Sequence, residues 1–283
     1  MRAATNPESP APITMTEEWL ANSGIIRALH EGSCRLKFIS ASWGTGQSLY
    51  VLSMPEPRSL YGSVVVVVGA SGVLGAAVAR LLASKGAQVV AAGPHVDRLT
   101  AAAIPGAAIV AADLRDAGSG DRLVNEVTTR FGRLDGLVNA AGIVGFGALA
   151  DTDDVAIEEL FLTNVIGPLW LLRRVIPLLS ASKGFVMNIS AVVAEQPLPG
   201  MVSYAASKAA LTAADRALAR ELRPLGVHVC DVRPPHTETG LADRAISGHA
   251  PKLPTGLDPA VVAARIVLAI EQNEREVGSD QFA

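Results

Sequence analysis

The chain has 283 residues with a formal net charge of −3, and 49% of them are hydrophobic. This length suffices for a well-buried core in one large domain or two small ones. The small charge and the lack of a basic stripe argue against nucleic acid as a partner. Cys34 and Cys230 lie far apart, so neither a metal site nor a disulfide framework is expected. With no signal-peptide pattern and no apolar run of about 18 residues, we expect a cytoplasmic protein with no membrane partner.

Residues 1–62 differ from the rest and are predicted to form an N-terminal extension with a disordered, Pro-rich start. An amphipathic pattern predicts a short helix near Thr16. Residues 35–55 predict two short strands around a turn at Trp43–Gln47, and residues 54–63 are typical of a linker. The extension is expected to be an arm that packs on the main domain or on a partner subunit. The alternative is that the true start lies downstream.

Regular alternation of strand and helix patterns begins at residue 64. Apolar runs predict strands at 64–68, 87–93, 107–114, 134–142, 185–190 and 227–235. Helical periodicity predicts helices at 72–84, 121–131, 153–179, 204–222 and 258–272. Strands that alternate with helices form right-handed βαβ units. The sequence therefore predicts an α/β fold, a doubly wound Rossmann-type parallel sheet with helices on both faces, in which ligands bind beyond the carboxyl ends of the strands.

A glycine-rich turn joins the first predicted strand to the first predicted helix. In VVVVVGASGVLG the three glycines are Gly69, Gly72 and Gly75. They allow a tight turn and a close approach of a pyrophosphate, and the helix start offers free N–H groups and a positive dipole end. Strand, glycine-rich turn and helix in this order are more specific than a glycine motif alone. Residues 63–283 are therefore predicted to be a dinucleotide-binding domain.

The end of the second predicted strand bears on the choice between NAD and NADP. An acid there favours NAD and a basic residue favours NADP. The sequence has Gly93, Pro94 and His95 at this position, and Asp97 fits better as the start of the next helix. Because His95 or Arg98 would meet a 2′-phosphate, the pattern leans toward NADP, with NAD as the alternative.

Tyr204 and Lys208 lie four residues apart in YAASK, so they share one face of a helix. An ammonium near a phenol stabilises the phenolate and lowers the phenol pKa from about 10. A phenol tuned in this way is suited to general acid or base catalysis. The pair follows the fifth predicted strand on the ligand side of the sheet, which favours a catalytic role over a surface Tyr–Lys contact.

Several motifs in a fixed order make residues 63–270 resemble the short-chain dehydrogenases/reductases. They are GASGVLG at 69–75, Asp113 in AADL, NAAG at 139–142, Asn164 in LFLTNVIGPLW, YAASK at 204–208 and RPPHTET at 233–239. The resemblance implies hydride transfer between a nicotinamide and a carbonyl or alcohol carbon. It implies that Tyr204 donates the proton, that Lys208 holds the cofactor ribose and lowers the Tyr204 pKa, and that Asn164 anchors a water of the proton relay.

The resemblance also implies a set of residues that bind the cofactor. They are Gly69, Ser71, Gly72, Leu74, Gly75, His95, Asp113, Leu114, Asn139, Ala140, Gly142, Tyr204, Lys208, Pro234 and Thr237. Three motifs depart mildly from the family pattern. The glycines are spaced G-x-x-G-x-x-G instead of G-x-x-x-G-x-G, NNAG is NAAG, and the usual Pro-Gly after the sixth strand is Pro234-Pro235.

The largest departure concerns the family serine that hydrogen-bonds the substrate oxygen thirteen residues before the tyrosine. Ala191 occupies this position in the present chain, and Ser190 precedes it. Ser190 stays a candidate catalytic residue, although neighbouring side chains of a strand face opposite ways. Ser203, next to Tyr204, is a weaker substitute. Loss of one such donor typically costs about 10²–10³ in rate.

Residues 238–258 are rich in Gly and Pro and correspond to a substrate lid. With Val192, Pro197 and Leu198 they predict an apolar pocket. We therefore expect an NAD(P)-dependent oxidoreductase that acts on the carbonyl or hydroxyl group of an apolar small molecule. The alternatives are a non-redox isomerase, dehydratase or cyclase on the same scaffold, or a cofactor-binding protein with weak catalysis. The apolar faces of the helices at 153–179 and 204–222 predict a homodimer or homotetramer.

Overall fold

The computed structural model describes residues 35–38, 50–53 and 57–282. The chain divides into two compact units, residues 1–57 and 58–283, which are described separately. In the first unit, β1 (Arg35–Phe38) pairs antiparallel with β2 (Tyr50–Ser53), which confirms the two predicted strands. The predicted helix near Thr16 and the turn at Trp43–Gln47 lie outside the described residues.

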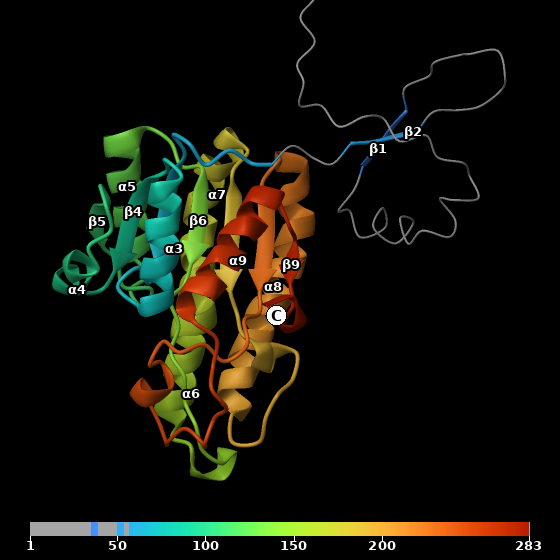
Figure 1. Cartoon of the computed structure of the whole chain (residues 1–283). Helices are drawn as coiled ribbons and strands as arrows, with labels where there is room; N and C mark the ends of the chain where they lie inside the picture. Colours follow the sequence, from blue (N-terminus) through green and yellow to red (C-terminus); the bar gives the residue numbers. More distant parts are fainter. Residues whose placement is uncertain (1–34, 39–49, 54–56, 283) are drawn as a thin grey trace, which may run out of the picture. The chain divides into compact units, whose positions relative to one another are not determined.

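The second unit is built on a seven-stranded parallel sheet in the order β5-β4-β3-β6-β7-β8-β9 (Figure 1). Its strands are β3 (Val64–Val68), β4 (Gln88–Gly93), β5 (Ala108–Ala111), β6 (Gly136–Asn139), β7 (Phe185–Ile189), β8 (His228–Val232) and β9 (Glu276–Val277). The order reverses between β3 and β6, as in doubly wound sheets. All five valines of β3 are buried because helices cover this central strand on both faces. The predicted fold class is confirmed; β9, with two residues, was not predicted.

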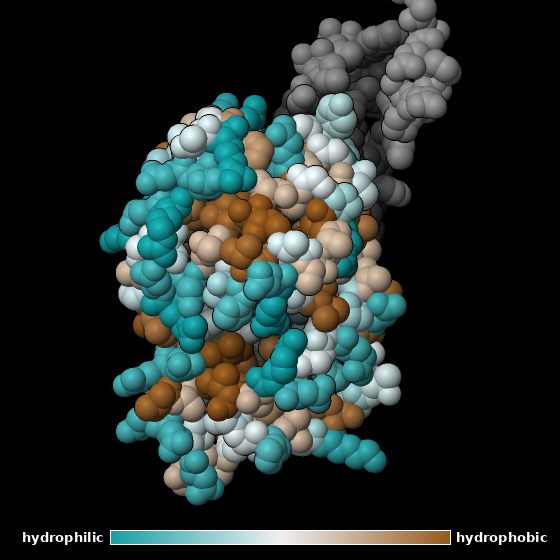
Figure 2. Space-filling model, turned by 90° about the vertical axis from the view of Figure 1, so that its left-hand side faces the viewer, coloured by the Kyte–Doolittle hydropathy of each residue, from teal (hydrophilic) through white to brown (hydrophobic). Residues whose placement is uncertain are grey.

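The helices form one layer on each face of the sheet. They are α3 (Val73–Ser84), α4 (Val96–Ala101), α5 (Ser119–Phe131), α6 (Asp154–Phe161), α7 (Gly167–Ser182), α8 (Val202–Leu222) and α9 (Pro259–Gln272). Val65 and Val67 of β3 pack against α3 and α9, whereas the alternate valines pack against α5 and α7. Figure 1 shows α3 and α9 together in front of the sheet. On the side of α4, α5 and β5, Figure 2 shows hydrophobic patches separated by hydrophilic residues.

The helix predicted at 153–179 is interrupted by a π-helical segment, Leu162–Ile166. Pro168 has no N–H to donate to the carbonyl of Asn164 four residues earlier, and the Gly167 N–H bonds the Leu162 carbonyl instead. Asn164 therefore lies in the irregular turn. By length and composition the stretch Asp154–Ser182 could span a membrane, contrary to the expectation from the sequence, but 44% of its apolar window is buried inside the domain. Core helices that lie mostly buried inside a domain also satisfy this criterion of length and composition.

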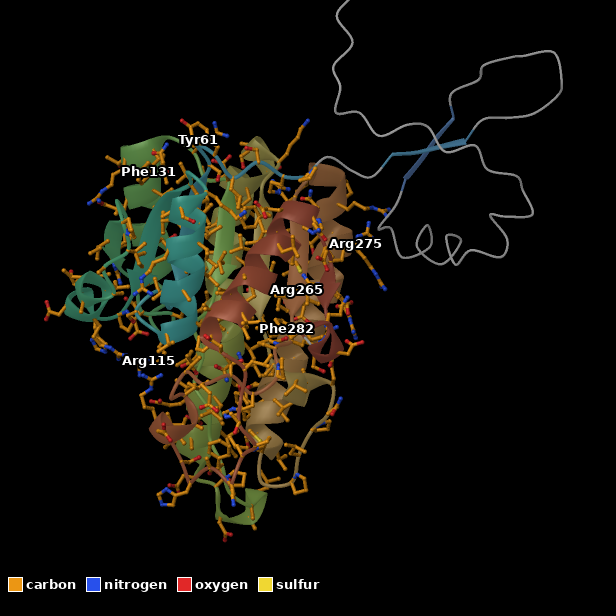
Figure 3. All side chains as sticks on the ribbon, in the orientation of Figure 1. Tyr61, Arg115, Phe131, Arg265, Arg275 and Phe282 are labelled. Carbon is orange, nitrogen blue, oxygen red and sulfur yellow. The ribbon has the colours of Figure 1, made fainter. Side chains whose placement is uncertain are left out.

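The second unit begins at Arg58, within the segment predicted to be a linker. The Arg58 N–H bonds the Glu271 carbonyl at 2.6 Å and its Nε bonds Asn273 Oδ1 at 3.0 Å. Leu60 is buried in the core layer of α3 and α9. These contacts attach residues 58–62 to the domain. At the other end of the chain, Arg265 of α9 bonds the Gln281 carbonyl at 3.1 Å, and the adjacent Phe282 is buried (Figure 3).

Candidate active site

A cavity of about 260 Å³ lies where the loops after β3, β6, β7 and β8 meet. The predicted site residues that line it are Gly72, Leu74, Gly75, Ala140, Gly142, Ser190, Tyr204, Lys208, Pro234 and Thr237. Its other wall is apolar and is formed by Val144, Phe146, Val192, Leu198, Met201, Leu241 and Leu253. No Asp or Glu is among the described residues that line it. The cavity therefore joins a polar, glycine-lined side to an apolar side, as the predicted apolar pocket requires.

The glycine turn after β3 provides room that side chains would fill. Gly69 has φ +78°, a left-handed conformation, and a Cβ there would lie 2.7 Å from the Ala140 backbone. A Cβ on Gly75 would overlap the Gly69 carbonyl oxygen, whereas one on Gly72 would lie 3.3 Å from it. The first turn of α3 begins at Val73, directly after this turn. The turn and the free N–H groups of the helix start fit a pyrophosphate.

Substitution at Gly75 should disrupt this turn more than substitution at Gly72. We expect Gly75→Ala to weaken cofactor binding by at least about tenfold and to lower the Tm, because the new Cβ meets backbone that cannot move aside. Gly72→Ala is the matched control and should weaken binding less. Titration of reduced cofactor by fluorescence and thermal unfolding measure the two effects. Equal affinity in both variants would contradict the assignment of Gly75 to the phosphate turn.

The adenosine side of the site lies at the ends of β4 and β5. His95 is exposed at the start of α4, and Asp97 lies in the first turn of that helix, as the sequence predicts. Asp113 forms an ion pair with Arg115 at 2.8 Å, and the hydrogen bonds from Arg115 lower the pKa of the Asp113 carboxyl. Asp113 is thus held as an anion that can accept a hydrogen bond from an amino group of a ligand. Leu114 is buried against the backbone of Gly167.

Four predicted residues lie around the glycine turn and the β6 loop. Gly69 begins the turn, directly after β3, and its carbonyl lies against Gly75 of α3. The Ser71 hydroxyl lies 3.7 Å from the position that a Cβ on Gly93 would take. Asn139 is buried at the end of β6; its Oδ1 accepts a long hydrogen bond from the Ala141 N–H at 3.4 Å. The Asn139 Nδ2 is buried without a partner among the described residues, and Asn139 is not among the residues that line the cavity.

Tyr204 and Lys208 lie one turn apart on α8, and both are buried. The Lys208 Nζ donates to the Ile189 carbonyl at 3.0 Å. Burial lowers the pKa of Lys208 to about 8, and the charges of Asp231 and Asp215 oppose this shift. Burial raises the pKa of Tyr204 above its ordinary value. The structure shows the effect of phenolate desolvation on the Tyr204 pKa, and the lowering of this pKa by Lys208 stays a prediction.

Asn164 joins the π-helical segment to the loop after β6 and to α8. Its Nδ2 donates to the Ile143 carbonyl and to Ser207 Oγ, both at 3.0 Å, and its Oδ1 accepts from the Ile143 N–H at 3.0 Å. A Cβ on Gly142 would lie 3.2 Å from Lys208 Nζ and 3.3 Å from Asn164 Oδ1. Both N–H groups of the Asn164 side chain are thus used in holding the loop beside Lys208, so a water would bond to an acceptor of this residue, Oδ1 or the backbone carbonyl.

Ser190 does not replace the hydroxyl that Ala191 lacks. The Ser190 Oγ donates to Asp231 Oδ1 at 2.5 Å and also approaches the Val232 carbonyl at 3.2 Å. A serine has one hydroxyl proton, and this proton is committed to β8. The candidate role of Ser190 as a donor to the substrate is corrected on this ground. Ser203 lines a second, smaller cavity, whereas Ala191 itself lines the main one.

The predicted lid covers the apolar side of the cavity. A β-bridge between Thr237 and Leu257 joins the two ends of this segment. The residues of the segment that line the cavity include Leu241, Ala242, Arg244 and Leu253. The Ile246 N–H bonds the Val144 carbonyl at 2.9 Å, and the Phe146 N–H bonds the Ser247 carbonyl at 2.9 Å. These bonds tie residues 238–258 to the loop after β6.

A buried ionic cluster behind Lys208 was not predicted. Arg233 bonds Asp231 at 2.5 Å and Glu276 at 2.9 Å, and it also bonds Glu195. Two opposite charges two residues apart in the apolar run VHVCDVRPP were the available signal, because alternate residues of a strand share a face. The partners Glu195 and Glu276 come from distant parts of the chain and carry no such signal.

Comparisons with known proteins identify the family of the chain. The model of the short chain dehydrogenases matches residues 63–249. An uncharacterized oxidoreductase of Staphylococcus saprophyticus is 31% identical over 221 residues, which cover 75% of this chain and 93% of that protein. Dehydrogenase/reductase SDR family member 7B of Danio rerio is 30% identical over 241 residues, with 77% of each chain covered.

Solved structures show the same fold. A short-chain dehydrogenase from Streptomyces avermitilis superposes with a TM-score of 0.69 at 30% identity and covers 78% of this chain and 89% of its own. A short chain dehydrogenase from Burkholderia cenocepacia in complex with NADP superposes with a TM-score of 0.70 at 24% identity, covering 78% of this chain and 90% of its own. The chain therefore belongs to the short-chain dehydrogenase/reductase family of oxidoreductases.

Proposed function

We propose that this protein is an NAD(P)H-dependent reductase of apolar ketones or aldehydes, with Tyr204 as the proton donor. The observation that carries the proposal is the position of Tyr204, whose side chain lines the cavity at the junction of its glycine-rich and apolar sides. An apolar carbonyl compound on one side and a nicotinamide on the other would both reach Tyr204. The absence of acids from the described cavity lining is consistent with an uncharged, apolar substrate.

The residues present fit a dinucleotide. Gly69 and Gly75 leave a cradle that a Cβ would fill, the start of α3 supplies N–H groups, and Asp113 is an anionic acceptor on the adenosine side. The bound nicotinamide supplies the hydride. Lys208 would hold the ribose hydroxyls, and Thr237 is a further polar residue that lines the cavity.

The protein's own residues supply the proton. Since burial raises the pKa of Tyr204, its hydroxyl stays protonated at neutral pH and donates to the carbonyl oxygen as the alcohol forms. Tyr204 is therefore in the protonation state that carbonyl reduction requires in the neutral range. The Lys208 ammonium stabilises the phenolate left after the transfer, which is the step where its positive charge matters most.

The Lys208 pKa gives a prediction for the pH dependence of the reaction. Lys208 is charged below its pKa of about 8 and neutral above it. We expect kcat/KM for ketone reduction to be constant at neutral pH and to fall above about pH 8. Lys208→Arg keeps the charge and should remove this alkaline limb, even if the absolute rate is lower. A profile that stays flat to the ordinary lysine value of 10.5 would contradict the role of Lys208.

The cofactor preference is proposed to be NADP, with NAD as the alternative. β4 ends at Gly93, so no acid stands at the position that would bind a ribose 2′-hydroxyl. His95 and Arg98 are exposed beside it and would meet a 2′-phosphate. Dissociation constants for NADPH and NADH measured side by side test this preference, and tighter binding of NADH would overturn it.

Ala191 favours a second candidate function. Without a donor at this position the site supports Tyr204 acid–base chemistry better than it supports polarisation of a carbonyl. A non-redox isomerase, dehydratase or cyclase on the same scaffold, or a cofactor-binding protein with weak catalysis, is the alternative. Incubation with NADPH or NADH and a panel of apolar ketones separates the functions: loss of reduced cofactor supports the reductase, whereas tight cofactor binding with no oxidation of any kind supports the alternative.

We also propose that the protein is a homodimer or homotetramer. Val155 of α6, Leu169 of α7 and Val202 of α8 are 67%, 38% and 49% exposed, so these helices present apolar side chains on the outside of the domain. A second copy that covers them would remove this surface from water. Gel filtration with light scattering measures the state, and a monomer at micromolar concentration would exclude it.

A further inference from the structure

We propose that Asp231 is a positioning residue for the reaction: its buried carboxylate is the counter-ion that keeps the Lys208 ammonium charged inside the domain. The inference deepens the proposed function, because Lys208 is the cation on which the Tyr204 chemistry depends. Asp231 lies on β8 and is 1% exposed. The strand register places Val232, the next residue, beside Ile189, whose carbonyl accepts the hydrogen bond from Lys208.

Both oxygens of Asp231 accept hydrogen bonds, which identifies the group as a carboxylate. Oδ1 accepts from Ser190 Oγ and Oδ2 accepts from Arg233, each at 2.5 Å. A protonated acid would need one of these oxygens as a donor. Asp231 is therefore charged in the folded protein, and its carboxylate lies on the face of β8 that α8 covers.

The ionic cluster around Arg233 carries an excess negative charge. Its carboxylates are Asp231, Glu195 and Glu276, and its guanidiniums are Arg233 and Arg216, which bonds Glu276 at 3.0 Å. Three anions against two cations leave one negative charge. Asp231 is the most deeply buried of the three acids and is the one nearest in the sheet to Lys208. The cluster therefore supplies the charge that a buried ammonium requires.

The other groups that face Lys208 supply less of this charge. On β7 the side chains are Asn188 and Ser190, and on the π-helical segment Asn164; all are neutral. On α8 itself, Asp215 accepts one hydrogen bond from Asn188 at 2.5 Å, and its second oxygen is buried without a partner among the described residues. Burial raises the pKa of Asp215 well above its ordinary value, and the charge of Asp215 opposes the shift of the Lys208 pKa less than that of Asp231 does. Asp215 is therefore the comparison for Asp231.

The test is a direct titration of Lys208 by NMR in the full-length protein. The sequence contains five lysines, so labelling them with ¹³C at Cε gives a simple spectrum, and Lys208→Arg assigns the resonance. In the wild type we expect Lys208 to titrate near pH 8. Asp231→Asn should move this titration down by about 1–3 pH units, and Asp215→Asn should move it down by less.

Asp231→Asn keeps the shape of the site, since its Oδ1 can accept from Arg233 and Ser190 can donate to the Val232 carbonyl instead. If this variant does not fold, Asp231→Ser is a smaller neutral replacement with room for a water. An unmoved Lys208 titration in a folded neutral variant would overturn the proposal, as would an equal shift in Asp215→Asn. Because the NMR titration is measured on the protein without substrate, it tests the role of Asp231 whether or not the protein reduces any ketone.

Discussion

Tyr204→Phe should lower kcat/KM for ketone reduction by about 10²–10⁴, because general acid catalysis contributes that much and the phenyl ring has no proton to donate. The Tyr204 hydroxyl forms no hydrogen bond with the described residues, so its removal leaves no partner unsatisfied and the fold should be kept. Steady-state kinetics measure the loss. Cofactor affinity, measured by fluorescence titration, should change much less.

Two comparisons make this result specific. Ser203→Ala, at the neighbouring position on α8, removes a hydroxyl that lies outside the main cavity and should leave the rate within about twofold. Tyr204→Phe that keeps full turnover would exclude Tyr204 as the acid. A loss of cofactor binding equal to the loss of rate would instead assign Tyr204 to cofactor binding alone.

Ala191→Ser should raise kcat/KM for ketone reduction, by up to about 10²–10³, the typical worth of one donor to a developing oxyanion. Ala191 is half-buried and lines the cavity, so a hydroxyl there has access to a substrate oxygen. Neither Ser190 nor Ser203 supplies that donor, since one is bonded to Asp231 and the other faces a second cavity. The gain should appear in kcat more than in KM, because the new bond strengthens as charge develops.

Ala191→Val is the matched control for this gain. The valine side chain has one more heavy atom than that of serine and no hydroxyl proton. Any gain common to both variants would therefore come from packing and not from a hydrogen bond. No rise in Ala191→Ser over the wild type would show that a missing donor does not limit the rate. In that case the substrate or the lid supplies the polarisation, or the reaction is not carbonyl reduction.

The sheet and the outline of the site follow from local patterns in the sequence. Valines at 64–68 with glycines directly after them predicted a central strand and a ligand-binding turn, and the structure has β3 and a tight Gly69–Gly75 turn there. The four-residue spacing of Tyr204 and Lys208 placed both side chains on one face of α8. These features depend on neighbours in the chain, so the sequence is sufficient for them.

The features that the sequence did not show depend on partners far away in the chain. The Ser190 proton is taken by Asp231, 41 residues later, and Arg233 is bonded to Glu195 and Glu276. The direction of the Tyr204 pKa shift depends on how deeply α8 is buried. The break at Leu162–Ile166 had a local signal, Pro168, which cannot donate to the carbonyl four residues before it.

Transfer of deuterium tests the central claim, reduction of a carbonyl carbon, most directly. The protein is incubated with an apolar ketone and NADPH or NADH deuterated at the reactive carbon of the nicotinamide, and the alcohol is analysed by mass spectrometry. The account predicts that the alcohol formed by the wild type carries one deuterium on its carbinol carbon. With Tyr204→Phe the amount of this alcohol should be about 10²–10⁴ times smaller. Tight binding of the cofactor with no deuterated alcohol from any ketone of the panel would contradict it.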